Sequence, residues 1–78
     1  MFDAEGNKLE RGGLYELTMD LKATSYLNQK EEIELLAGTE VMYLLDEAGN
    51  HSMRYVFQTL YGTMVYIEPG SVIAVRKN

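Results

Sequence analysis

The strictest alternation of apolar and polar residues lies between Tyr15 and Thr24. The apolar positions of this segment are Tyr15, Leu17, Met19, Leu21 and Ala23, and the residues between them are polar or charged. Successive side chains of a β-strand point to opposite faces, whereas a helix would spread these positions around its whole circumference. The pattern therefore predicts one strand with an apolar face and a polar face.

The rest of the chain predicts several shorter strands separated by turns. The apolar segments are Ile33–Leu35, Val41–Leu45, Met53–Phe57, Thr63–Ile67 and Val72–Val75. Asp46–Asn50 and Gly62 have turn chemistry, and Pro69 is expected to end a strand because it cannot donate to the sheet ladder. For the polar segment Ser25–Glu32 we favour a long loop over the alternative, a short helix capped by Ser25.

Five or six short strands with closely spaced turns predict an all-β fold, closed or nearly closed into a small barrel. Closure would also remove the exposed strand edges of such a small sheet. We expect residues 1–78 to form one domain, in which residues 2–13 are a turn-rich lead-in.

Two segments resemble parts of the SH3-like barrels. Glu32–Val41, which reads EIELLAGTEV, resembles their diverging turn, and Gly62–Val75, which reads GTMVYIEPGSVIAV, resembles their final segment. The resemblance implies a five- to six-stranded SH3-like barrel. It also implies that Ala23–Glu32 occupies the place of the long loop between the first two barrel strands.

The resemblance does not extend to the polyproline-binding groove of eukaryotic SH3 domains. The chain has no Trp, and the segment that should carry the tandem aromatic site, Arg54–Phe57, reads RYVF. Asp20–Ala23 stands where the first-strand aromatic motif is expected. Polyproline binding is therefore carried over to no residue, and the chain is most similar to prokaryotic or phage SH3-like modules.

Composition narrows the classes of function. The chain has no Cys, which excludes disulfides. Its formal net charge is −5, and a negative charge repels phosphate backbones and anionic lipids. No apolar run is long enough to span a membrane, and MFDAEGNKLERGG lacks the pattern of a signal peptide. The expected location is the cytoplasm.

The sequence contains few residues or motifs that could support catalysis. His51 is the only His, and it falls in a predicted turn where an exposed role is expected. Asp46, Glu47, Asn50 and His51 lack the spacing of a calcium loop, and Gly12–Gly13 lacks the Lys-Ser/Thr of a phosphate loop. We therefore predict no enzyme activity, no cofactor and no metal site.

The feature that points to a function is a surplus of apolar residues. Val41, Tyr43 and Leu45 are predicted on one face of their strand, yet the opposite face is also apolar, and the strand Thr63–Ile67 repeats this pattern. Because a small barrel has one core, the lead-in residues Phe2 and Leu9 must cover the second set, or it binds a partner. The candidate interaction patch comprises Met42, Leu44, Tyr61, Met64 and Tyr66, with Tyr26 and Leu27 as candidate loop contacts.

The predicted function is a non-catalytic adaptor or inhibitor, prokaryotic or phage in type, that acts by protein–protein contact. Its partner is not identified by the sequence, and a homodimer is one option, since Met and Tyr are enriched at interfaces. The alternative is an oligonucleotide-binding or small-ligand-binding barrel that uses its surface tyrosines. The acidic charge disfavours nucleic acid.

Overall fold

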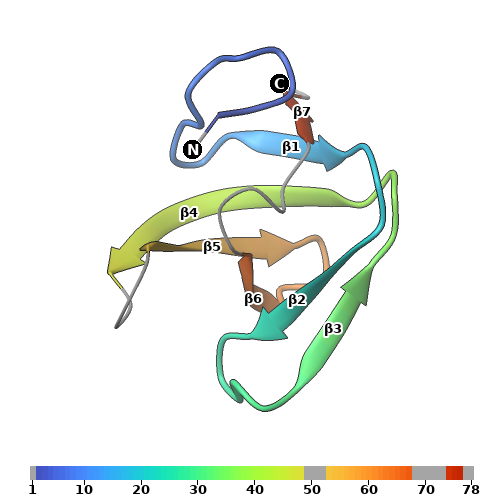
Figure 1. The fold of residues 1–78 in the computed structure, drawn as a ribbon, viewed down its shortest axis with the longest axis vertical. Helices are drawn as coiled ribbons and strands as arrows, with labels where there is room; N and C mark the ends of the chain where they lie inside the picture. The colour runs from blue at the N-terminus through green and yellow to red at the C-terminus, as the bar shows by residue number, and fades with distance from the viewer. Residues whose placement is uncertain (1, 49–52, 68–73, 77–78) are drawn as a thin grey trace.

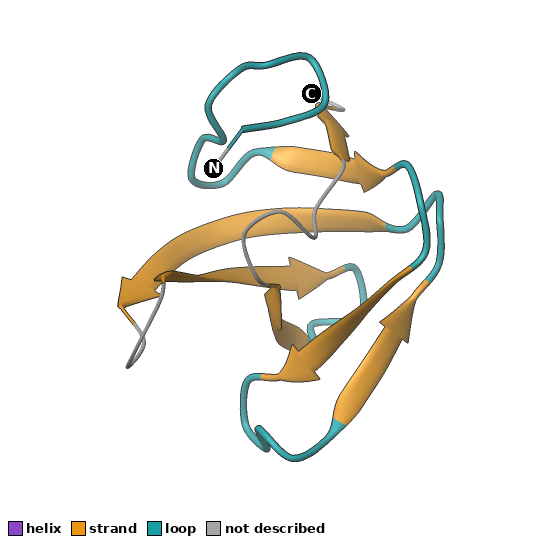
Figure 2. Cartoon of the chain, viewed as in Figure 1, coloured by secondary structure: helices purple, strands orange, loops and turns teal. Residues whose placement is uncertain are grey.

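The computed structural model describes residues 2–48, 53–67 and 74–76. All regular elements in these ranges are strands, which confirms the predicted all-β fold (Figure 2). The strands are β1 (Leu14–Leu17), β2 (Leu21–Ser25), β3 (Glu32–Leu35), β4 (Glu40–Ala48), β5 (Met53–Thr59), β6 (Met64–Ile67) and β7 (Ala74–Arg76).

The seven strands form one antiparallel sheet in the order β3-β2-β6-β5-β4-β1-β7 (Figure 1). β4, β5 and β6 form a meander, and β1 lies between β4 and β7. The β2–β3 hairpin joins the other side of the meander through β2 and β6, and it runs obliquely to β1, β4 and β5 (Figure 1). Because β3 and β7 stand at the two ends of this order, the described strands form an open sheet. We expected a closed or nearly closed barrel, and full closure is not found among these strands.

The segment predicted as one strand from Tyr15 to Thr24 is two strands, which is why the sheet has seven strands and not five or six. β1 and β2 are separated by residues 18–20, and they pair with different neighbours. Tyr15, Leu17 and Ala23 are buried on either side of the break, as the alternation predicts, but Met19 is 46% exposed. Because Met19 is apolar, the alternation continues across residues 18–20, and the sequence gives no sign that the strand ends there.

The break is held by contacts with the turn that precedes β4. The Leu17 amide donates to the Thr39 carbonyl at 2.9 Å, and the Gly38 amide donates to the Leu17 carbonyl at 2.8 Å. Gly38 has φ +89°, a conformation that L side chains rarely adopt, so glycine suits this position. Beyond the break, Asp20 Oδ1 accepts the Ala37 amide at 2.7 Å. These bonds redirect the chain from β1 into the β2–β3 hairpin.

The segment Ser25–Glu32 forms the tip of that hairpin without a helix, as we favoured. The Ser25 amide donates to the Glu31 carbonyl at 2.9 Å, and the Glu31 amide donates to the Asn28 carbonyl at 2.9 Å. The Ser25 hydroxyl accepts the Asn28 amide at 3.3 Å. The hairpin is thus ordered by its own hydrogen bonds.

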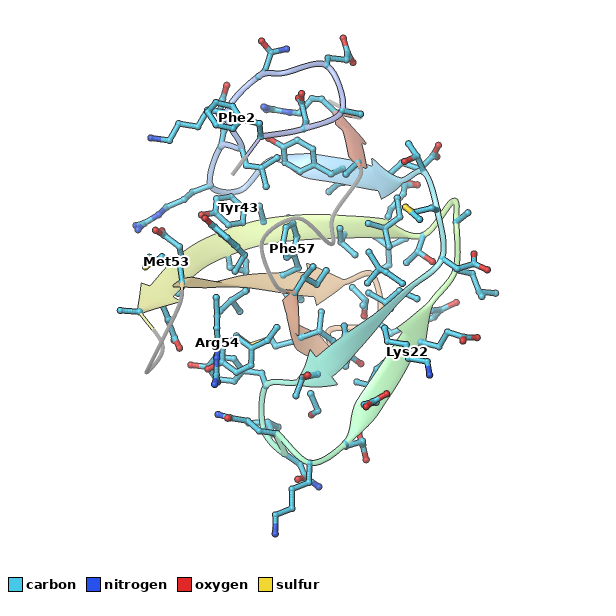
Figure 3. All side chains as sticks on the ribbon, in the orientation of Figure 1. Phe2, Lys22, Tyr43, Met53, Arg54 and Phe57 are labelled. Atoms are coloured by element: carbon cyan, nitrogen blue, oxygen red, sulfur yellow. The ribbon has the colours of Figure 1, made fainter. Side chains whose placement is uncertain are left out.

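The lead-in contributes to the main core. Leu9 is 6% exposed and packs with Tyr15, Leu17, Tyr43 and Phe57, whereas Phe2 is 62% exposed and lies in the lead-in loop (Figure 3). Gly13 permits the close approach of the lead-in, because a Cβ there would lie 3.0 Å from the Tyr15 ring and from the Glu10 carbonyl oxygen. Leu9 therefore belongs to the core that contains Phe57, and it does not cover the second apolar face.

A bulge in β4 changes which face Leu45 occupies. Tyr43 is opposite Phe57 and Leu45 is opposite Val56, so Leu44 is the extra residue. Val56 and Phe57 are neighbours in β5 and face opposite sides of the sheet. Leu45 therefore lies on the side away from Phe57, and the prediction that it shares a face with Tyr43 is wrong.

The last strand extends one residue further than predicted. β7 comprises Ala74–Arg76, so Arg76, which follows the predicted strand Val72–Val75, is part of the sheet. Its guanidinium lies 5.5 Å from the centre of the Tyr15 ring and 3.5 Å from a Glu10 carboxylate oxygen. Val72 and Pro69, which we predicted as the start of this strand and the end of the previous one, lie outside the described residues.

We expect Leu17→Ala to destabilise the fold by about 2–5 kcal/mol, because Leu17 is 1% exposed and its removal leaves a cavity. Leu27→Ala is the matched control, since Leu27 is 93% exposed and its change should stay within about 0.5 kcal/mol. Urea unfolding followed by circular dichroism measures both free energies. Equal effects of the two substitutions would contradict the assignment of Leu17 to the core.

Candidate functional site

Two members of the predicted patch lie in one row across the meander. Met42 is opposite Gln58 in β5, and Gln58 is opposite Met64 in β6. Directly opposed residues share a face of the sheet, so Met42 and Met64 lie on the same face with Gln58 between them. Both methionines are half-buried. Leu44 is also half-buried, at the bulge in β4.

Tyr66 occupies a buried position on the second face. It is 8% exposed and lies opposite Val56, which is completely buried. Its hydroxyl donates to a Glu47 carboxylate oxygen at 2.8 Å, and the Tyr26 hydroxyl donates to the other oxygen at 3.2 Å. The two tyrosine rings are 5.0 Å apart between centres. Tyr26 and Tyr66 therefore link the tip of the β2–β3 hairpin to β4.

Arg54 completes this tyrosine cluster. Its guanidinium lies 5.4 Å from the centre of the Tyr66 ring, and it donates to the Gln29 side-chain oxygen at 3.1 Å. Figure 3 shows Arg54 extending from β5 toward the hairpin tip. The cluster covers part of the second apolar face with the hairpin tip, which is an arrangement that neither of our two alternatives contained. Leu27, at the same tip, is 93% exposed.

The remaining member of the predicted patch, Tyr61, lies at a different place. It is 97% exposed in the turn between β5 and β6, next to Leu60, which is 70% exposed. These two residues border a hollow of about 460 Å³ that lies between β3 and this turn. We call it the β3 hollow; it is lined by Ile33, Glu34, Leu35, Leu36, Gly38, Thr39, Glu40, Thr59, Leu60, Tyr61 and Thr63.

The β3 hollow gathers exposed apolar side chains. Among the described residues, seven large apolar side chains are exposed, and three of them, Leu36, Leu60 and Tyr61, line this one hollow. Exposed apolar residues that stand alone are ordinary on a protein surface, but a group around a hollow is typical of a binding site. The β3 hollow is therefore our candidate functional site.

The polar groups of the hollow add a second feature. Glu34 and Glu40 line it, so its lining is acidic. The Thr59 hydroxyl is buried and has no hydrogen-bond partner among the described residues.

The β3 hollow adjoins the row that contains Met42. A second hollow of about 250 Å³ is lined by Leu14, Met42, Gln58, Thr59, Leu60 and Gly62. Because Thr59 and Leu60 line both hollows, the apolar surface continues around the β5–β6 turn from Ile33 to Met42. Sequence reasoning thus found Met42 and Tyr61 but missed Ile33, Leu36 and Leu60. Leu36 and Leu60 could have been found from their positions: each directly follows a strand, β3 or β5, where turn residues are usually polar.

Other kinds of site find little support in the described part of the chain. None of its carboxylates forms a group of three metal-ligating side chains, and His51 and Asn50 lie outside the described ranges. No helix in the same ranges could cross a membrane. The rings of Tyr15, Tyr43 and Tyr66 are buried, so Tyr61 is the one fully exposed ring among the described tyrosines.

Comparison with protein-family models, with curated sequences and with solved structures finds no match for this chain. The resemblance to SH3-like barrels therefore stays a prediction.

The tyrosine cluster predicts a loss of stability at alkaline pH. Hydrogen bonding to the Glu47 carboxylate, together with burial, raises the pKa of Tyr66 from 10.0 to about 12. Because the fold favours the neutral phenol, this contribution is complete below pH 10 and is lost as the pH rises toward 12. Burial and the nearby Asp46 carboxylate also raise the pKa of Tyr43, so a smaller loss should remain without Tyr66.

We therefore expect Tyr66→Phe to unfold in urea with a shallower decrease in stability between pH 10 and about 12 than the unsubstituted protein. Tyr61→Phe, at a 97% exposed position, is the control and should keep the original pH dependence. Tyrosinate absorbance in the folded protein gives the pKa directly. An unchanged pH dependence in Tyr66→Phe would contradict the role assigned to the cluster.

Proposed function

We propose that this protein is a non-catalytic protein-interaction module that binds its partner through the β3 hollow. The observation that carries this proposal is the convergence of Leu36, Leu60 and Tyr61, all exposed, on one hollow of about 460 Å³. Aromatic and aliphatic side chains around a hollow are what protein interfaces use as anchors.

The charge around the hollow selects the kind of partner. Glu34 and Glu40 line it, and the whole chain has a net charge of −5. An acidic rim attracts a basic surface and repels a second copy of the same acidic chain. The proposed partner is therefore a different protein with a basic contact surface, and a homodimer through this face is disfavoured.

We also propose an SH3-like architecture for the module, as the sequence resemblance implies. Its support is the position of the β2–β3 hairpin: the resemblance places a long loop at Ala23–Glu32, and the tip of this hairpin, between β2 and β3, falls within that segment. The chain contains no Trp, so the proposed binding surface differs from an aromatic polyproline groove. A prokaryotic or phage adaptor or inhibitor in the cytoplasm remains our proposal for the setting.

The alternative, an oligonucleotide-binding or small-ligand-binding barrel, would need exposed rings as stacking platforms. Tyr61 offers one, whereas Tyr26 and Tyr66 are engaged with Glu47. We therefore favour binding of a protein partner over binding of an oligonucleotide or small ligand at this surface.

The test replaces apolar side chains of the hollow and follows binding. We expect Leu60→Ser combined with Tyr61→Ser to weaken binding of a partner captured from the native cells by about tenfold or more, since exposed anchors carry much of the energy of an interface. The capture identifies a protein, and titration calorimetry with the purified partner measures the affinity of each variant.

Leu27→Ser tests the rival location, because Leu27 is 93% exposed at the hairpin tip, where we predicted a candidate loop contact. It should leave the affinity unchanged, and circular dichroism should show that all variants are folded. A partner that is lost with Leu27→Ser and retained by the hollow variant would overturn the proposed site.

A further inference from the structure

We propose that the partner segment docks as an additional β-strand along the free edge of β3, with basic and apolar side chains in alternation. This inference rests on the proposed function and specifies the chemistry of the partner. It draws on the position of β3 in the sheet, the direction of its backbone groups and the charges on its two faces.

Among the described strands, β3 is an edge strand. It stands at the end of the sheet order and pairs with β2, which in turn pairs with β6 on its other side (Figure 1). An edge strand presents backbone N–H and C=O groups that another extended chain can pair with. Strand addition of this kind gives affinity through the main chain and specificity through alternate side chains.

Backbone hydrogen bonds at the tip of the β2–β3 hairpin fix which backbone groups of β3 point outward. The Ser25 amide bonds across to the Glu31 carbonyl in the direction of β3, and the Tyr26 amide bonds to the Met64 carbonyl in the direction of β6. Bonding alternates along an antiparallel strand, so Ala23 and Ile33 form a bonded pair and Thr24 and Glu32 do not. The backbone groups of Glu32 and Glu34 therefore point to the free edge.

The two faces of β3 differ in chemistry. Leu35 is buried and Ile33 is half-buried against the core, while Glu32 and Glu34 are exposed on the outer face. Lys22 lies opposite Glu34 in the hairpin and points outward (Figure 3), whereas the neutral Thr24 lies opposite Glu32. The outer face of β3 is thus acidic on balance, since Lys22 offsets one of the two glutamates and the charges of Lys30 and Glu31 beside the strand cancel.

The side chains of an added strand would continue both faces of β3. Its inward side chains would extend the apolar face of Ile33 over the β3 hollow, toward Leu36 and Leu60. Its outward side chains would stand beside Glu32 and Glu34, where like charges are unfavourable and basic side chains favourable. The same two glutamates discourage pairing of β3 with the β3 of a second copy. The geometry therefore favours a foreign strand that alternates basic and apolar residues.

The experiment selects ligands without assuming a sequence. A phage-displayed library of random peptides is panned against the full chain, and enriched peptides are retested against Leu60→Ser with Tyr61→Ser and against Leu27→Ser. We expect the enriched peptides to alternate basic and apolar residues. They should bind Leu27→Ser normally and the hollow variant about tenfold more weakly.

Backbone methylation then tests the strand geometry. The best peptide is synthesised with N-methyl groups on one or the other of its two alternating sets of residues. Only the set whose N–H groups face β3 should lose affinity, by about tenfold for two lost hydrogen bonds, and the other set should bind normally. In NMR spectra the unmodified peptide should shift the amides of residues 32–35. Glu32→Lys with Glu34→Lys should weaken binding severalfold, and more so at low salt.

The outcomes separate this inference from the proposed function. Peptides that depend on Leu60 and Tyr61 but lack alternation, or that bind equally with either set methylated, would overturn strand addition and leave the proposed site standing. Enrichment of no peptide that depends on these two residues would overturn both. Pairing between copies of the chain, seen as a dimer by light scattering that Glu34→Lys alters, would replace the foreign strand with a self-interaction.

Discussion

The arrangement of the whole sheet depends on two backbone hydrogen bonds at Leu17. Its amide and its carbonyl are both bonded to the turn before β4, through Thr39 and Gly38. They fix the point at which the chain leaves β1 and starts the β2–β3 hairpin. If the chain continued straight, β2 would extend β1 beside β4, and β3 would not reach the far side of the meander. The free edge and the hollow beside it both follow from this change of direction.

Much of the fold follows from the alternation of apolar and polar residues. The strands at Ile33–Leu35, Val41–Leu45, Met53–Phe57 and Thr63–Ile67 all exist, with ends displaced by a few residues. The alternation did not predict the break between β1 and β2. Met19 continues the rhythm through a break, because sequence spacing contains no information on which strand a hydrogen bond reaches. Leu44 likewise adds one residue to β4, which moves Leu45 to the other face.

The candidate site was predicted only in part, because it lies where strands end. Met42 and Tyr61 were predicted, and both line hollows that meet at Leu60. Leu36 and Leu60 follow strand ends, where periodicity no longer assigns a face to a side chain. For Tyr66, the sequence predicted the face but not the burial. The side chain is covered because it contacts Glu47 of β4 and Tyr26 of the β2–β3 hairpin. The partners of a polar group on another element are a tertiary property that local patterns do not contain.

The position of β1 between β4 and β7 determines when the protein can acquire its structure during synthesis. β4 is available to β1 after a short stretch of chain, but Tyr15, Glu16 and Leu17 obtain their second neighbours only from residues 74–76. Contacts between residues so far apart in sequence form late, since the intervening chain must first be ordered. The β2–β3 hairpin and the β4–β6 meander use shorter separations and can form as the chain leaves the ribosome. The β1 edge stays unpaired until residues 74–76 have emerged, so the nascent chain exposes a strand edge that β7 covers in the folded sheet.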